Sequence, residues 1–181
     1  MAIAYLSLGS NIDAERNLRS SIKALRSQFG DVLVSPIYQS AAVGFEGDDF
    51  LNAAARLETS LDPIALDAWL HDLEDQHGRR RDVPRFSSRP LDIDVLLYDA
   101  LIFKGPGNLE LPRSELAEQA FVLRPMVDIA SQCVHPIIGR TLREIWESMS
   151  IGDRESVRMS RISFDHEGWG ASNPDPKPKE P

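Results

Sequence analysis

A cluster of arginines runs directly into a strand-like segment with two aspartates, and this junction restricts the fold more than any other feature of the sequence. Residues 91–95 alternate between apolar and acidic side chains. Because successive side chains of a β-strand point to opposite faces, Asp92 and Asp94 share one face of this segment. The arginines before it are Arg79, Arg80, Arg81, Arg85 and Arg89. The sequence therefore predicts a strand with a carboxylate pair on its polar face, preceded by a cationic loop.

The chemistry of this junction suits a divalent metal and a phosphate-bearing ligand. Two neighbouring carboxylates repel each other, and a hard cation removes that cost. Magnesium in proteins usually takes a few carboxylates together with phosphate oxygens of a substrate, and arginine binds phosphate oxygens through paired hydrogen bonds. An arginine run or an Asp-x-Asp pair alone is more often a solvated surface. Their adjacency favours a site for a metal–nucleotide complex.

Composition limits the class of protein. The 181 residues suffice for one domain with a sizeable core, and a hydrophobic share of 42% is ordinary for a globular chain. A formal net charge of −8 disfavours nonspecific nucleic-acid binding. Without a long apolar run or the basic flank of a signal peptide, we expect a cytoplasmic protein that binds no membrane. The single cysteine, Cys133, excludes a disulfide within the chain.

The order of expected elements defines the fold class. Apolar periodicity and turn residues predict strands at 2–8, 32–38, 50–59 and 91–98, and helices at 14–29, 62–78, 118–130 and 141–149. This order predicts an α+β, ferredoxin-like βαββαβ core with an antiparallel sheet and extra C-terminal helices. Its helices would cover one face, leaving the other free for a ligand. We expect one domain over 1–150 and a C-terminal extension over 151–181, with at least 172–181 disordered.

Several separated motifs occur in an order typical of one family. They are Gly9-Ser10-Asn11, Phe50-Leu51-Asn52, Glu74 with residues 78–81, residues 85–94 and Ala120-Phe121-Val122-Leu123. On these motifs residues 1–149 resemble the 6-hydroxymethyl-7,8-dihydropterin pyrophosphokinases of folate biosynthesis. For Asn11, taken alone, capping of the first helix is the stronger interpretation.

The resemblance implies transfer of pyrophosphate from ATP to the hydroxymethyl group of a reduced pterin, with AMP as the other product. Two Mg²⁺ ions would bind Asp92 and Asp94, and ATP would be the co-substrate. Arg79 and Arg89 would be catalytic, neutralising charge on the transferred group. The resemblance also implies ATP-binding residues, which are Glu74, Arg81 and Arg113. Such a reaction depends on positioning and electrostatics.

The resemblance further implies a pterin site and a set of partners. Asn52 would hydrogen-bond the ring edge and Phe121 would stack on the ring. The loop around Val43 and Gly44 would enclose it beside Phe50, and loop closure would exclude water. The expected partners are ATP and the reduced pterin, with no nucleic acid and no membrane, for a protein that acts as a monomer.

Departures from the family pattern leave a second hypothesis open. Phe86, Ser87 and Ser88 stand where tryptophan, glycine and proline are usual, and Phe50 stands where tyrosine is common. Arg113 replaces a histidine and Gln119 an arginine. Loss of a charge-stabilising group lowers rates by on the order of 10²-fold or more. The alternative is a weakened or inactive homologue that binds nucleotide or pterin. An RNA-binding ferredoxin-like module is disfavoured by the acidic charge and the few aromatic residues.

Overall fold

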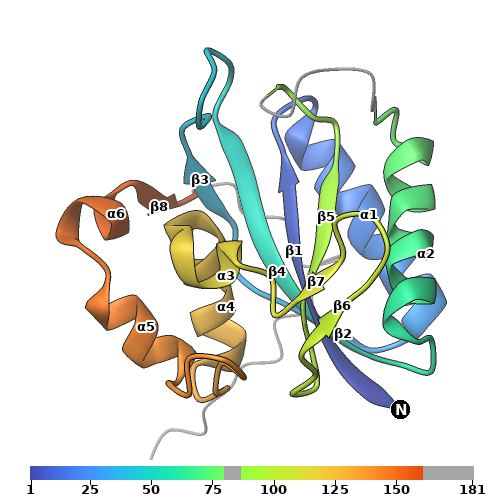
Figure 1. Ribbon diagram of the computed structural model, residues 1–181. Coiled ribbons are helices and arrows are strands. Elements are labelled where there is room, and N and C mark those ends of the chain that lie inside the picture. The colour runs from blue at the N-terminus through green and yellow to red at the C-terminus, as the bar shows by residue number, and fades with distance from the viewer. Residues whose placement is uncertain (80–86, 161–181) are drawn as a thin grey trace, which may run out of the picture.

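The computed structural model describes residues 1–79 and 87–160, which form a main antiparallel sheet with helices on both faces and a separate two-stranded ribbon (Figure 1). In chain order the elements are β1 (Ala2–Ser10), α1 (Ala14–Phe29), β2 (Val32–Val34), β3 (Tyr38–Ser40), β4 (Phe50–Thr59), α2 (Pro63–Gln76), β5 (Asp92–Tyr98), β6 (Phe103–Lys104), β7 (Glu110–Leu111), α3 (Glu115–Glu118), α4 (Ala120–Ala130), α5 (Leu142–Ser148), α6 (Ile151–Glu155) and β8 (Val157–Met159). Among these described residues, no helix has the length and apolar composition needed to cross a membrane.

The main sheet is built around β1. Its strand order is β5-β1-β4-β3-β8, with β2 also paired to β4, and the pairings are antiparallel. The short strands β6 and β7 form a separate ribbon. The expected α+β class, with a βαββαβ order and an antiparallel sheet, is confirmed.

The expected single strand over 32–38 is wrong in detail. The segment forms two short strands, β2 and β3, which pair with successive parts of β4. Pro36 lies between them and has no N–H to donate to a sheet, so pairing is interrupted there. Ser35 bridges the gap, since its hydroxyl accepts a hydrogen bond from the N–H of Ala54 at 2.9 Å.

Helices α1 and α2 cover one face of the sheet, as expected. Leu18, Ile22 and Leu25 of α1 are buried at helical spacing against the sheet. Helix α2 starts at the predicted Asp62-Pro63 pair, where the Asp62 side chain accepts a hydrogen bond from the N–H of Ala65. Leucines at equivalent positions of α2 complete this core.

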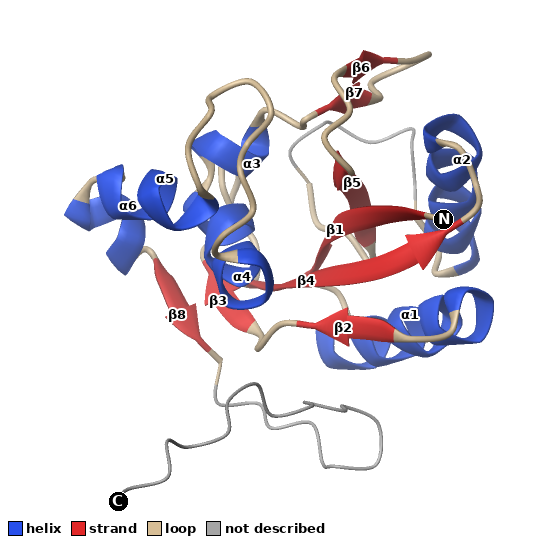
Figure 2. Cartoon of the chain, turned by 90° about the horizontal axis from the view of Figure 1, so that it is seen from below, coloured by secondary structure: helices blue, strands red, loops and turns tan. Residues whose placement is uncertain are grey.

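The expectation that the second face is free for a ligand is wrong for much of its area. Helices α3, α4 and α5 pack on it, so that helices lie on both sides of the sheet (Figure 2). The covered part is apolar and includes Ala54, Leu96 and Leu97. A register shift of β5 between Tyr5 and Leu6 makes Leu96 an extra residue, which turns it toward these helices. Burial of this apolar patch explains why the C-terminal helices dock here.

The C-terminal elements differ partly from their expected bounds. The helix expected over 118–130 is split, because Gln119 has extended backbone angles between α3 and α4. Beyond residue 150, β8 pairs with β3 at the edge of the main sheet. The domain boundary at 150 stays a prediction, and the disorder expected for 172–181 lies outside the described residues.

The strand directions bring three connections to one end of the sheet. β1 ends where β4 and β5 begin, because both neighbours run antiparallel to it. The turn after β1, the connection from β3 to β4 and the residues that lead into β5 therefore meet at the upper end of the sheet in Figure 1. Asn52 near the start of β4, Arg89 before β5 and Asp92 at its start lie at this end.

Candidate active site

The two aspartates of β5 project from the same face, on either side of buried Ile93. Their side chains keep 25% (Asp92) and 29% (Asp94) of their surface exposed. In the sheet, Asp92 pairs with Gly9 and Asp94 with Ser7 of β1. The predicted carboxylate pair is thus present and accessible at the rim of the sheet.

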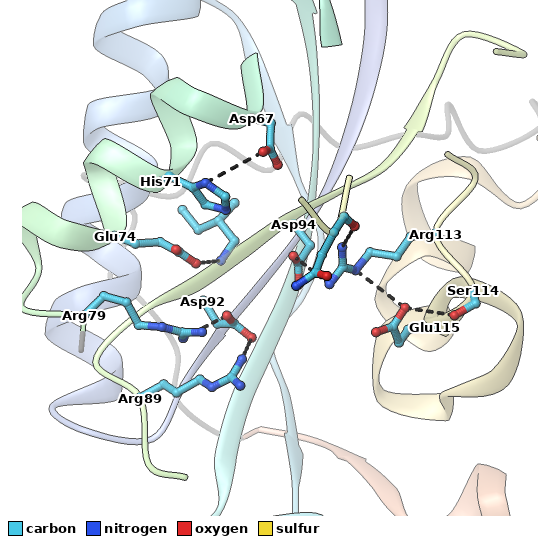
Figure 3. Close-up of polar contacts among 12 residues, drawn as sticks. Asp67, His71, Glu74, Arg79, Arg89, Asp92, Asp94, Arg113, Ser114 and Glu115 are labelled. Carbon is cyan, nitrogen blue, oxygen red and sulfur yellow. Dashed lines mark hydrogen bonds and ion pairs between the residues drawn. The ribbon is translucent and has the colours of Figure 1, made fainter. Parts of the chain in front are cut away.

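Asp92 is held between two arginines. Nη1 of Arg79 lies 2.8 Å from Oδ1, and Nη1 of Arg89 lies 2.5 Å from Oδ2 (Figure 3). Arg79 also donates to the carbonyl oxygen of Leu91 at 3.3 Å. Both predicted catalytic arginines therefore contact the same carboxylate, one on each oxygen.

Asp94 faces a different arginine. Nη2 of Arg113 lies 3.0 Å from Asp94 Oδ1, and Nε of Arg113 lies 3.5 Å from a carboxylate oxygen of Glu115 (Figure 3). Burial of the carboxyl group, followed by the charge of Asp92, raises the pKa of Asp94 to about 7, and the charge of Arg113 opposes this rise. The position thus favours an added positive charge.

Glu74 anchors the strand that carries both aspartates. It is only 3% exposed at the end of α2, and its Oε1 accepts a hydrogen bond of 2.9 Å from the N–H of Ile93. Ile93 lies between the two aspartates in the chain, so this bond fixes the backbone from which both project. A glutamate near the end of a helix opposes the helix dipole, and a strand N–H is one of its partners here.

Between Asp92 and Asn52 lies one position of the sheet that carries no side chain. Gly9 of β1 pairs with Asp92 on one side and with Asn52 of β4 on the other. With strands about 4.8 Å apart, the backbones of Asp92 and Asn52 are about 10 Å apart. A Cβ atom at Gly9 would lie 3.6 Å from Asn52 Oδ1 and would fill the space between them. This glycine leaves the sheet bare where a flat ligand would reach the carboxylates.

Asn52 is oriented toward this gap. The side chain is 6% exposed, and its Nδ2 donates to Ser40 Oγ at 2.9 Å. Within residues 1–79 and 87–160, no side chain or backbone group donates to its Oδ1, which points over Gly9. Asn52 therefore presents an open acceptor to whatever lies on the bare strand.

The other residues predicted for the pterin site come from the β3–β4 connection, the start of β4 and the first turn of α4. Phe50 meets Phe45 edge to face with ring centroids 6.3 Å apart. Val43 is 53% exposed, and Gly44 has a φ of 82°, a conformation that glycine adopts without strain. Phe121 lies in the first turn of α4 and packs against the cluster of Tyr38, Ala120 and Val157. Since Tyr38 is the register partner of Asn52, Phe121 lies one strand away on the same face.

Sequence reasoning missed the role of Asn11. Its side chain does not cap α1; Asp13 holds the N-cap position, without a side-chain hydrogen bond. Nδ2 of Asn11 donates to the carbonyl oxygen of Asp48 at 3.0 Å and to Ser88 Oγ at 3.2 Å, while Oδ1 accepts from the N–H of Arg89 at 2.7 Å. Asn11 thus joins the connection before β4 to the segment before β5. Its place in a Gly-Ser-Asn turn was the only signal in the sequence.

Asn11→Ala is expected to loosen both connections at once. It removes three hydrogen bonds, each worth about 1 kcal/mol net, so amide hydrogens near Asp48 and Arg89 should exchange faster in the same variant. Ser88→Ala is the matched control, because it removes one of the three bonds and leaves the contact to Asp48. Unchanged exchange near Asp48 in Asn11→Ala would contradict this account.

The carboxylate pair fits a divalent cation that takes its other ligands from a substrate. In the part of the chain that the structure describes, no group of three or more His, Cys, Asp and Glu side chains could hold a metal alone. The two carboxylates nevertheless share one face of β5 and both stay partly exposed, so they offer oxygen ligands to a cation that takes its other ligands from a substrate. Of the predicted site residues, Arg81 lies outside the described residues.

Comparison with known sequences identifies relatives. Residues 5–131 match the sequence profile of 7,8-dihydro-6-hydroxymethylpterin-pyrophosphokinase (HPPK). The 2-amino-4-hydroxy-6-hydroxymethyldihydropteridine pyrophosphokinase of Haemophilus influenzae is 36% identical over 141 residues, which cover 75% of this chain and 86% of that protein. The protein of the same name from Bacillus subtilis is 37% identical over 134 residues, covering 72% and 79%.

Comparison with solved structures agrees on the fold. The crystal structure of wild-type Plasmodium falciparum HPPK-DHPS matches with a TM-score of 0.69 and 12% identity, covering 87% of this chain. This chain spans 48% of the length of that protein, and at this identity the likeness concerns the fold alone. The profile match and the two relatives reach over most of the sequence, and on that basis the chain belongs to the 7,8-dihydro-6-hydroxymethylpterin-pyrophosphokinase family.

Proposed function

We propose that this chain transfers pyrophosphate from ATP to 6-hydroxymethyl-7,8-dihydropterin, giving AMP and the pterin diphosphate in folate biosynthesis. The observation that carries the proposal is the bare strand at Gly9, which joins the arginine-lined carboxylates of β5 to the open acceptor of Asn52. A polyphosphate at one end and a flat heterocycle at the other would bring the two reacting groups together. Positioning of this kind supplies much of the catalysis in phosphoryl transfer.

On the nucleotide side, we assign Asp92 and Asp94 as the residues that hold two Mg²⁺ ions. Bound there, the ions would neutralise phosphate oxygens and make the phosphorus more electrophilic. Arg79 and Arg89 stand next to the same carboxylate and are long enough to turn to the transferred group. Arg113 serves the ATP side with Arg81, and Glu74 keeps the aspartates in place through Ile93.

On the pterin side, the roles follow from hydrogen-bonding capacity and shape. Asn52 Oδ1 is an open acceptor that matches an N–H donor on the ring edge. Phe121 stacks on the ring, while Phe50 at the start of β4 and Val43 and Gly44 in the β3–β4 connection close the site. Exclusion of water there keeps water from competing with the hydroxymethyl group as acceptor. We further propose that the protein acts in the cytoplasm as a monomer.

A second candidate is a homologue that binds nucleotide or pterin without efficient transfer. Gln119 favours it, because this residue cannot supply a cation and sits in an extended linker between α3 and α4. Arg113 supplies a positive charge in place of the missing one, since its guanidinium contacts Asp94 and also lies near Glu115.

The proposal is tested by incubating the purified chain with ATP, Mg²⁺ and 6-hydroxymethyl-7,8-dihydropterin. AMP and pterin diphosphate should form in equal amounts, and EDTA in excess over Mg²⁺ should stop the reaction. AMP without the pterin product would mean hydrolysis. Measurable ATP or pterin binding with no turnover would instead select the second candidate.

A further inference from the structure

The contact between Arg113 and Asp94 has a consequence for how a cation enters the site. Nη2 of Arg113 lies 3.0 Å from Asp94 Oδ1, and the two side chains are only 22% and 29% exposed. The guanidinium thus already supplies a positive charge to this carboxylate. A divalent ion bound to the same carboxylate would repel the guanidinium in its present position. The repulsion would be strong, because the two charges would be close together in a partly buried site.

The remaining contacts of the Arg113 side chain are weaker than its ion pair with Asp94 and do not fix it in its present position. Nε lies 3.5 Å from Glu115, and Nη1 donates to the carbonyl oxygen of Asn108 at a long 3.4 Å. The backbone, in contrast, is fixed by a 3.0 Å hydrogen bond from the N–H of Arg113 to the carbonyl oxygen of Leu96. The side chain can therefore turn about a fixed base.

We propose that Arg113 is a displaceable counter-ion of Asp94, which excludes a free divalent cation until a polyphosphate draws the guanidinium away. The cation then enters together with the nucleotide, because the phosphates supply both a partner for Arg113 and further oxygen ligands for the ion. This inference rests on the proposed function and adds a residue that controls when the metal site opens.

The test uses Mn²⁺ as the probe and needs no turnover. Binding of Mn²⁺ alone is measured by calorimetry, or from the free-ion signal in electron paramagnetic resonance, for the wild-type chain and Arg113→Gln. We expect the variant to bind Mn²⁺ at least about 10-fold more tightly, because removing a neighbouring cation favours an added one. Adding Asp94→Asn to the variant should remove the gain.

Two further measurements make the result specific. Arg19→Gln is the matched control, because it changes the net charge equally at a surface position that pairs with Glu15 on α1; its Mn²⁺ affinity should equal that of the wild type. A non-hydrolysable ATP analogue should raise Mn²⁺ affinity strongly in the wild type and less in Arg113→Gln. If that variant does not fold by circular dichroism, Arg113→Met takes its place.

The outcomes separate the inference from the proposed function. Suppose that the wild type binds Mn²⁺ with the nucleotide and forms AMP, but Arg113→Gln binds Mn²⁺ alone no more tightly than the wild type does. This result would overturn the inference and leave the proposed function standing. Failure of the wild type to bind Mn²⁺ even with the ATP analogue would overturn the assignment of Asp92 and Asp94, and with it the proposed function.

Discussion

Asp94→Asn is expected to lower Mg²⁺-dependent AMP formation by about 10³-fold or more, since metal-ion catalysis supplies several kcal/mol of transition-state stabilisation. The change keeps the size of the side chain but removes one of the two carboxylates that hold the cation. It also removes a charge that partial burial disfavours, as the raised pKa of Asp94 shows, and Arg113 keeps Glu115 as a second ion-pair partner at 3.5 Å. We therefore expect the variant to unfold no earlier than the wild type on heating.

Asp92→Asn should lose activity to a similar extent but should also lose stability. The side chains of Arg79 and Arg89 are 14% and 21% exposed, and both pair with this carboxylate. Neutralising it leaves two partly buried guanidinium groups without that counter-charge, a costly state. Melting temperatures of the two variants in EDTA measure this difference.

Asp67→Asn is the control for both variants. Asp67 lies on α2 near His71, outside the carboxylate pair, and undergoes the same chemical change. Its AMP formation should match the wild type. Retained Mg²⁺-dependent activity in Asp94→Asn would remove Asp94 from the metal site, whatever the stability data show.

The parts of the site that sequence could predict are those with a local pattern. The alternation in residues 91–95 places Asp92 and Asp94 on one face wherever the strand lies in the sheet. Likewise, the Asp62-Pro63 pair sets the start of α2 without reference to the rest of the chain. For these residues the backbone geometry of one element decides the outcome.

The parts that sequence missed depend on contacts between distant segments. Asn11 bonds to groups 37, 77 and 78 positions away, and no local pattern distinguishes such an asparagine from a helix cap. The helices that cover the second face of the sheet were missed for a similar reason. Their position depends on which apolar face of α4 packs against Ala54 and Leu96, and these residues are distant in sequence. Only the assembled sheet shows that the Gly9 gap lies between Asp92 and Asn52.

Glu74→Ala is expected to destabilise the protein by about 2–3 kcal/mol, because it leaves the N–H of Ile93 buried without its acceptor. The lost bond also frees the backbone between Asp92 and Asp94, so the affinity for the metal–nucleotide complex should fall. Chemical denaturation gives the free energy of unfolding, and Mn²⁺ binding with an ATP analogue gives the affinity. Loss of affinity without loss of stability would argue against the anchoring role.

Glu74→Gln separates this anchoring role from a direct role in binding ATP. The amide oxygen can accept the same hydrogen bond, and the charge that helps to raise the pKa of Asp94 is removed. Stability should therefore remain within about 1 kcal/mol of the wild type, since the bond to Ile93 is kept and loses its charge-assisted part. If ATP affinity nevertheless falls, the carboxylate itself serves the nucleotide. If the variant is as unstable as Glu74→Ala, the bond to Ile93 is not what makes Glu74 necessary.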